Sequence, residues 1–190
     1  ALRLDVGDEA QVVEAMSGLQ SLDIVVNNAG IGGHSRAIDC DGDEWRSVFD
    51  VNVNGVFYVS REAARIMRTA GQGGSIVNIA SITGMRTAVG AAAYAPSKAA
   101  VIHMTKVLAL EWARFGVRVN AISPGYIETD LTREFLASPY GEEMRKRIPQ
   151  RRFGDLSDLD GPLLLLASQA SAYMTGSVLA VDGGHLATPL

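Results

Sequence analysis

A tyrosine and a lysine one helical turn apart are the clearest proton-transfer pair in the sequence. Tyr94 and Lys98 stand at positions i and i+4 of a predicted helix, and such positions share one helix face. A free tyrosine titrates near pH ~10, which is too high for acid–base work at neutral pH. A neighbouring cation favours the phenolate, so we expect Lys98 to lower the pKa of Tyr94 and make it a general acid or base.

Two further polar side chains have positions that fit the same chemistry. Ser81 follows a predicted strand and precedes Tyr94 by thirteen residues, so its hydroxyl could donate a hydrogen bond to a substrate oxygen. Asn52 lies among apolar residues of a long predicted helix, where a buried amide needs hydrogen-bond partners. Taken singly, each has an ordinary explanation: Ser81 as a strand-end hydroxyl and Asn52 as a satisfied core amide.

The elements that would position these side chains alternate along the chain. Apolar runs predict strands at residues 2–6, 22–27, 75–80, 117–122 and 177–181. Helical patterns occur at residues 9–19, 43–67, 93–115 and 155–168, with one or two surface helices within 128–152. Strands separated by helices imply right-handed crossovers and a doubly wound parallel sheet, an α/β fold of the Rossmann type.

Ligands of such a sheet bind beyond the carboxyl ends of its strands. The residues directly after the predicted strands include Asn28, Ser81 and Pro124. We therefore expect the functional side chains to gather along this edge.

Composition excludes several classes of protein. The 190 residues fit one domain, and 47% of them are apolar. The net charge of −4 without a basic block predicts neither a nucleic-acid nor a membrane partner. A single cysteine, Cys40, fits a reducing compartment, so we expect a cytoplasmic protein. Its histidines, His34, His103 and His185, are dispersed and predict no metal site.

Together the motifs resemble the classical short-chain dehydrogenase/reductase family. The residues that carry the resemblance are Asn28-Ala29-Gly30, Asn52, Ser81, Tyr94 with Lys98, Pro124-Gly125, Thr129, Arg152-Phe153-Gly154 and Val181-Asp182-Gly183-Gly184. The sequence is most similar in character to 3-oxoacyl-carrier-protein reductases and to related sugar and secondary-alcohol dehydrogenases. The similarity runs over the whole chain.

The resemblance implies an NAD(P)-dependent oxidoreductase that transfers hydride between nicotinamide and a secondary alcohol or ketone. Tyr94 would be the general acid or base, and Ser81 would position the substrate oxygen. Lys98 would hold the nicotinamide ribose and lower the pKa of Tyr94. Asn52 would hold a water that links Lys98 to solvent.

The resemblance also assigns residues to the cofactor. Asp5 and Val6 would contact adenine, and Asn28, Ala29 and Gly30 would pass under the adenosine ribose. On the nicotinamide side the resemblance places Tyr94, Lys98, Pro124, Gly125, Ile127 and Thr129. The strand end that chooses between NAD and NADP is not in this sequence, so that choice stays open. Helices that carry Asn52 and Tyr94 would pair between subunits, which implies a homodimer or homotetramer.

A small-molecule alcohol or ketone is the expected substrate. The pocket walls are expected at residues 82–92, 126–128 and 131–148, and these residues are mostly small or apolar. We therefore expect a neutral or mixed substrate: no arginine fork there is aimed at a carboxylate, although Arg86 and Arg133 could face one.

In the family's strand order, 3-2-1-4-5-6, the predicted strand at residues 2–6 would be the third. We therefore expect residues 1–190 to be the C-terminal three quarters of a single NAD(P)-binding domain. Its first two βα units and their glycine-rich phosphate turn would be absent from this sequence. An alternative stays open, in which a truncated or cofactor-dead homologue serves as a structural or assembly subunit.

Overall fold

Four parallel strands form the sheet of the protein. The structure, a computed structural model, describes residues 2–33, 35–129 and 132–188. The strands lie in chain order: β1 (Ile24–Asn27), β2 (Gly74–Ile79), β3 (Val117–Pro124) and β4 (Val178–Val181). The predicted doubly wound parallel sheet is confirmed.

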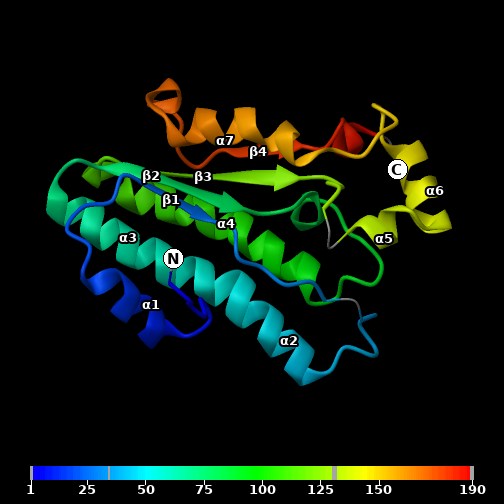
Figure 1. Cartoon of the computed structure of the whole chain (residues 1–190), viewed down its shortest axis with the longest axis horizontal. Coiled ribbons are helices and arrows are strands. Elements are labelled where there is room, and N and C mark those ends of the chain that lie inside the picture. Colours follow the sequence, from blue (N-terminus) through cyan, green and yellow to red (C-terminus); the bar gives the residue numbers. More distant parts are fainter. Residues whose placement is uncertain (1, 34, 130–131, 189–190) are drawn as a thin grey trace.

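Helices cover both faces of this sheet (Figure 1). Their bounds are α1 (Glu9–Ser17), α2 (Gly42–Phe49), α3 (Val56–Ala70), α4 (Tyr94–Trp112), α5 (Arg133–Leu136), α6 (Pro139–Arg147) and α7 (Asp160–Ala167). One face carries α3 and α4, the opposite face carries α7, and α5 and α6 lie beyond the carboxyl ends of the strands. The surface helices expected within 128–152 are α5 and α6; Asp130 and Leu131 lie outside the described residues.

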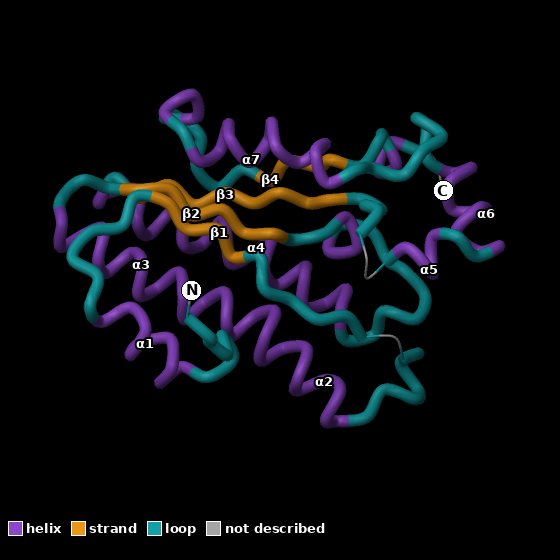
Figure 2. The backbone as a smooth tube through the Cα atoms, viewed as in Figure 1, coloured by secondary structure: helices purple, strands orange, loops and turns teal. Residues whose placement is uncertain are grey.

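The sheet lies between helices on its two faces (Figure 2), and apolar side chains pack in both interfaces. On the α3 and α4 side, Met67, Ile76 and Leu108 belong to one buried cluster. On the α7 side, Val77 and Leu166 pack together with Ile122. Burying such side chains stabilises the fold by about 1.5–3 kcal/mol each.

Hydrogen bonds between buried side chains fix the carboxyl half of this sheet against its helices. Asn27 Nδ2 on β1 donates to Ser60 Oγ on α3 and to Asn78 Oδ1 on β2, each at 2.8 Å. Asn78 Nδ2 in turn donates to Thr105 Oγ1 on α4 at 2.9 Å. Because these buried groups satisfy one another, they specify how two strands and two helices meet below the site.

The long helix expected over residues 43–67 is interrupted. Between α2 and α3, residues Asp50–Gly55 form a π-helical segment, and Asn52 is fully buried within it. A π-helical turn contains an extra residue, and such turns occur frequently at functional sites. The apolar periodicity that predicted a continuous helix does not register this insertion.

The strand expected at residues 2–6 is wrong. Residues 2–5 have no regular secondary structure, and Val6 and Gly7 form a turn. A strand exists only through hydrogen bonds to a neighbouring strand, and no described strand pairs with this segment. The segment packs on the π-helical turn instead, where a Cβ added at Gly55 would lie 2.8 Å from Val6 Cγ2.

Candidate active site

Ser81 and the start of α4 are brought together by a tight turn. Ser81 follows β2, and its hydroxyl accepts a hydrogen bond from the Thr83 amide at 3.2 Å at the start of a short 3₁₀ turn, Ile82–Gly84. A Cβ added at Gly84 would lie 2.7 Å from the Lys98 carbonyl carbon. The absence of a side chain at Gly84 therefore lets the Ser81 turn touch α4 beside its catalytic candidates.

Tyr94 occupies an environment that keeps its phenol protonated. Burial raises the pKa of Tyr94 above its usual value, and the nearby Ser81 hydroxyl opposes this rise in pKa by stabilising the ionised form. Lys98 Nζ lies 5.6 Å from the centre of the Tyr94 ring. The structure differs here from the expectation that Lys98 lowers the pKa of Tyr94, because the desolvation of the buried phenol is the larger effect.

Lys98 is a buried ammonium with unused donors. Its side chain is almost fully enclosed, and Nζ donates to the Ile79 carbonyl at 2.9 Å. Burial lowers the pKa of Lys98 to about 8, so roughly nine tenths of the groups remain charged at pH 7. An ammonium has three donors, and this is the single hydrogen bond of Nζ within the described residues.

Asn52 ties the π-helical turn to its surroundings. Its Nδ2 donates to the Ile31 carbonyl at 2.9 Å and to Ser97 Oγ at 3.0 Å. Its Oδ1 accepts from the Ile31 amide at 2.8 Å. Asn52 thus fixes the loop after β1 against α4, and its expected role in holding a water stays a prediction.

The backbone at Gly30 lies close to Asn52 and Lys98. A Cβ added at Gly30 would lie 3.2 Å from Asn52 Oδ1 and 3.5 Å from Lys98 Nζ. Asn28, Ala29 and Gly30 are exposed directly after β1. The unused Lys98 donors therefore lie beside the exposed loop that follows β1, and the expected contact of this loop with the cofactor stays a prediction.

The end of β3 presents backbone groups to the same edge. Ile127 forms an isolated parallel bridge with Gly154. The Gly154 amide donates to the Tyr126 carbonyl at 2.9 Å, and the Gly154 carbonyl accepts from the Glu128 amide at 2.8 Å. The Ile127 amide therefore points away from Gly154.

The flanking residues of that edge are held by local contacts. Thr129 Oγ1 lies 3.0 Å from Thr132 Oγ1. Pro124 ends β3, and a Cβ at Gly125 would lie 2.8 Å from Asp182 Cα, so Gly125 lets β3 and β4 converge.

Asp5 and Val6 lie apart from these groups, beside the π-helical turn. Asp5 Oδ1 accepts from the Gly7 amide at 2.9 Å, and Val6 packs on Gly55. The structure gives neither residue a contact with Lys98 or with Gly30. Their expected contact with adenine stays a prediction.

Arg86, Tyr126 and His185 lie together on this edge, and the sequence predicted a place in the pocket wall for only two of them. Tyr126 and His185 lie with ring centres 5.7 Å apart, and Arg86 Nη1 donates to the His185 carbonyl at 3.2 Å. The sequence placed Arg86 and Tyr126 in the pocket wall but gave His185 no role. His185 could have been predicted from its position directly after Gly183 and Gly184, where the chain leaves β4.

A cavity of about 330 Å³ lies beside Tyr126. Its lining includes Tyr126, Ile127, Phe153, Arg152 and Asp158. None of the four catalytic candidates lines it.

Within residues 2–33, 35–129 and 132–188, no group of three or more His, Cys, Asp or Glu side chains could hold a metal ion. His34, one of the dispersed histidines, lies outside these ranges. Among the helices of the described chain, none is long and apolar enough to span a membrane.

The sequence matches a family model described as enoyl-(acyl carrier protein) reductase over residues 1–185. It is 41% identical over 182 residues to a 2-dehydro-3-deoxy-D-gluconate 5-dehydrogenase from Dickeya dadantii, covering 95% of this chain and 72% of that protein. It is 40% identical over 185 residues to a 3-oxoacyl-[acyl-carrier-protein] reductase from Thermotoga maritima, covering 95% and 74%.

The fold also matches solved structures closely. A gluconate 5-dehydrogenase from Burkholderia cenocepacia, in complex with NADP and tartrate, superposes with a TM-score of 0.93. That protein is 36% identical in sequence, and the match covers 98% of this chain and 74% of the other. The edge that carries Ser81, Tyr94 and Lys98 therefore belongs to a fold that holds a nicotinamide cofactor in that relative.

Proposed function

Since the chain belongs to the short-chain dehydrogenase/reductase family, we propose that Tyr94, Lys98 and Ser81 act on a secondary alcohol of a polyhydroxylated small molecule. The protein is an NAD(P)-dependent oxidoreductase that transfers hydride between nicotinamide and an alcohol or ketone. The alternative of a cofactor-dead assembly subunit is not favoured, because the relatives are dehydrogenases and reductases.

The observation that carries this proposal is the buried set of Tyr94, Ser81 and Lys98. Burial and its effects on pKa leave Tyr94 protonated and most of Lys98 charged at neutral pH. A protonated phenol beside a hydroxyl is suited to donate a proton to a carbonyl oxygen while Ser81 positions that oxygen. When bound, the nicotinamide supplies or accepts the hydride.

Lys98, Gly30 and Asn52 would hold the cofactor's ribose. The unused Lys98 donors suit ribose hydroxyls, and Gly30 leaves the space that a side chain would fill. The Ile127 amide and Thr129 would meet the carboxamide and phosphates, with Asp5 and Val6 at adenine. Asn52 would keep a water between Lys98 and solvent.

The kind of substrate is inferred from the relatives. Several act, by name, on gluconate, 2-dehydro-3-deoxy-D-gluconate or galactitol, which supports a sugar acid or polyol. A 3-oxoacyl thioester is the second candidate, because reductases of that class are about as similar in sequence. Relative turnover of a polyol series and of an acetoacetyl thioester separates the two.

We propose a homo-oligomer and a cytoplasmic location as well. An exposed stripe on α4 is mostly uncharged: it contains Pro96, Ala99, His103, Val107 and Leu110, together with Lys106. Such a stripe is suited to bury itself against a second copy. The single cysteine fits a reducing compartment.

The test of the assignment is Tyr94→Phe in the native polypeptide, with Tyr173→Phe as control because Tyr173 is fully exposed. Loss of general acid–base catalysis is expected to lower kcat about 10²- to 10⁴-fold. Binding of NADH or NADPH, followed by fluorescence, is expected to stay near the wild-type value. Activity of Tyr94→Phe within tenfold of the control would show that another group moves the proton.

A further inference from the structure

Arg86, Tyr126 and His185 come from the segments that follow three different strands. Arg86 follows β2, Tyr126 follows β3, and His185 follows β4. The carboxyl ends of parallel strands share one edge, so these residues lie on the edge that also carries Ser81. The Arg86 amide donates to the Ile82 carbonyl at 2.8 Å, which places Arg86 about one turn beyond Ser81.

Each of these three side chains has hydrogen-bonding capacity that the described residues leave unused. His185 is 6% exposed, and its buried Nδ1 has no hydrogen-bond partner. Arg86 bonds through Nη1 alone, to the His185 carbonyl at 3.2 Å and to Thr188 Oγ1 at 3.0 Å. Its Nε and Nη2 remain for another acceptor. A buried polar atom without a partner calls for an explanation, and a bound ligand supplies one.

The charges around this cluster favour an anion. Burial raises the pKa of Tyr126 and lowers that of His185, and the positive charges of Arg86 and Arg147 act on both rings in the direction of a lower pKa. The opposing acid is Asp182, whose two carboxylate oxygens accept the Gly184 and Leu186 amides at 2.9 and 2.7 Å. Because those hydrogen bonds hold the Asp182 carboxylate in its own turn, the positive side chains are left to face a ligand.

We propose that Arg86, Tyr126 and His185 bind the carboxylate of the substrate, and that the substrate is therefore a hydroxy acid or its oxo acid. This inference rests on the proposed function and names its substrate class. The free edge of a guanidinium matches the two oxygens of a carboxylate. The sequence led us to expect a neutral or mixed substrate and named Arg86 as able to face a carboxylate, whereas His185 joins the wall only through the fold.

The test compares six-carbon aldonates with the alditols of the same configuration, which differ only in the carboxylate. The wild-type protein is assayed with NAD and with NADP. Its kcat/KM is expected to be at least tenfold higher for an aldonate than for the matching alditol. Arg86→Gln is expected to reduce this preference about tenfold to hundredfold, mainly through the KM of the acid, as loss of a charge-assisted contact predicts.

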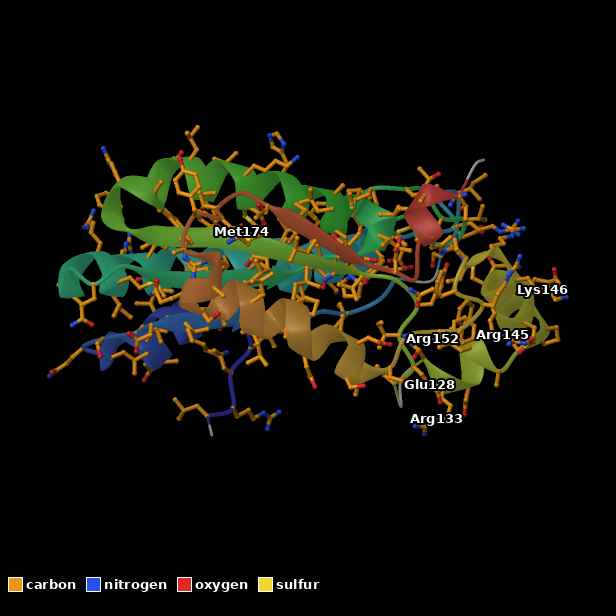
Figure 3. The ribbon with its side chains drawn as sticks, turned by 90° about the horizontal axis from the view of Figure 1, so that it is seen from above. Glu128, Arg133, Arg145, Lys146, Arg152 and Met174 are labelled. Carbon is orange, nitrogen blue, oxygen red and sulfur yellow. The ribbon has the colours of Figure 1, made fainter. Side chains whose placement is uncertain are left out.

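The control is Arg145→Gln, which removes the same charge from the exposed face of α6 at the same end of the molecule (Figure 3). It is expected to leave the preference within twofold of wild type. Arg86→Lys keeps the charge and is expected to restore part of the preference.

His185→Phe is a second probe, which keeps the ring beside Tyr126 and removes Nδ1. We expect His185→Phe to lower the preference for aldonates over alditols severalfold. If Arg86→Gln fails to fold, this variant provides the test. Hydride transfer with no preference for acids overturns the carboxylate site and leaves the proposed function standing. The carboxylate site is also overturned if Arg86→Gln and Arg145→Gln change the preference equally. It is overturned as well if an alditol phosphate is turned over faster than an aldonate. No hydride transfer with any polyol or acid overturns the proposed function itself.

Discussion

Burial shifts the pKa values of the two central residues in opposite directions. Tyr94 and Lys98 share a helix face, yet desolvation raises the pKa of Tyr94 and lowers that of Lys98 to about 8. Both shifts favour the neutral form of a buried group. The site thus begins with a proton on Tyr94, which suits reduction of a carbonyl.

The cost of burying Lys98 should be measurable as a pH-dependent stability. The unfolded chain binds more protons than the folded chain between pH 8 and pH 10.5, because the pKa of Lys98 is about 8 in the folded chain and the usual lysine pKa is 10.5. Wild-type stability should therefore rise through this window relative to Lys98→Met, by about 3 kcal/mol in free energy of unfolding. Urea unfolding at pH 7.5, 9 and 10 measures the difference.

Lys106→Met on the exposed side of the same helix is the control for that measurement. It should show no such pH-dependent difference from wild type. A constant difference between Lys98→Met and wild type across the window would contradict the lowered pKa of Lys98. Lys98→Met should also lose turnover in the oxidoreductase assay, since the Lys98 ammonium lies beside the loop after β1, where the ribose is proposed to bind.

At the scale of elements, the π-helical turn between α2 and α3 joins both sides of the cofactor edge. Asn52 bonds the loop after β1 and Ser97 on α4, while Gly55 lies against Val6. An uninterrupted α-helix would rotate these residues relative to one another. The extra residue in the turn therefore lets one helix contact both the loop after β1, where the ribose is proposed to bind, and the segment at residues 5–7.

Gly55→Ala tests the contact between this turn and the N-terminal segment. The added Cβ would meet Val6 Cγ2 at 2.8 Å and the Val6 carbonyl oxygen at 3.1 Å. We expect a loss of about 1–3 kcal/mol in the free energy of unfolding, together with a higher KM for the cofactor as Val6 moves.

Gly161→Ala is the matched control, since a Cβ at Gly161 in α7 meets nothing within 4 Å. It should stabilise the fold by about 0.5–1 kcal/mol, because alanine is the better helix residue. If Gly55→Ala left the free energy of unfolding unchanged, the segment at residues 5–7 would be able to move away from the added Cβ without destabilising the fold.

At the scale of the whole molecule, the exposed stripe of α4 lies opposite the side of the helix that packs on the sheet. Leu110 is 82% exposed and Val107 is 41% exposed, whereas Leu108 and Ala109 are buried in the core. Large exposed apolar side chains in a row mark an interaction surface. Assembly through α4 would also hold in place the helix that carries Tyr94 and Lys98.

Leu110→Glu should shift the oligomer towards monomer, because a carboxylate in an apolar interface is costly to desolvate. Size-exclusion chromatography with light scattering over a concentration series measures the change. Leu19→Glu, at a half-exposed position after α1, is the control and should keep the wild-type mass. An unchanged mass for Leu110→Glu would exclude α4 as the contact.

The sequence by itself determined the features that depend on short-range geometry. Helix periodicity places Tyr94 and Lys98 on one face, and the alternation of apolar runs with helices predicts the parallel sheet and the edge where Ser81 lies. These relations follow from residue spacing, because the geometry of one helix or one βα unit is nearly independent of the rest of the chain.

Only the tertiary structure decided what depends on burial and on contacts between distant segments. The pKa directions of Tyr94 and Lys98 follow from the layers packed over them, and the π-helical turn from the partners that Asn52 finds at Ile31 and Ser97. Arg86 and His185 are 99 positions apart and meet because β2 and β4 end at one edge. Desolvation and long-range packing exist only once the chain has folded, so no local pattern encodes them.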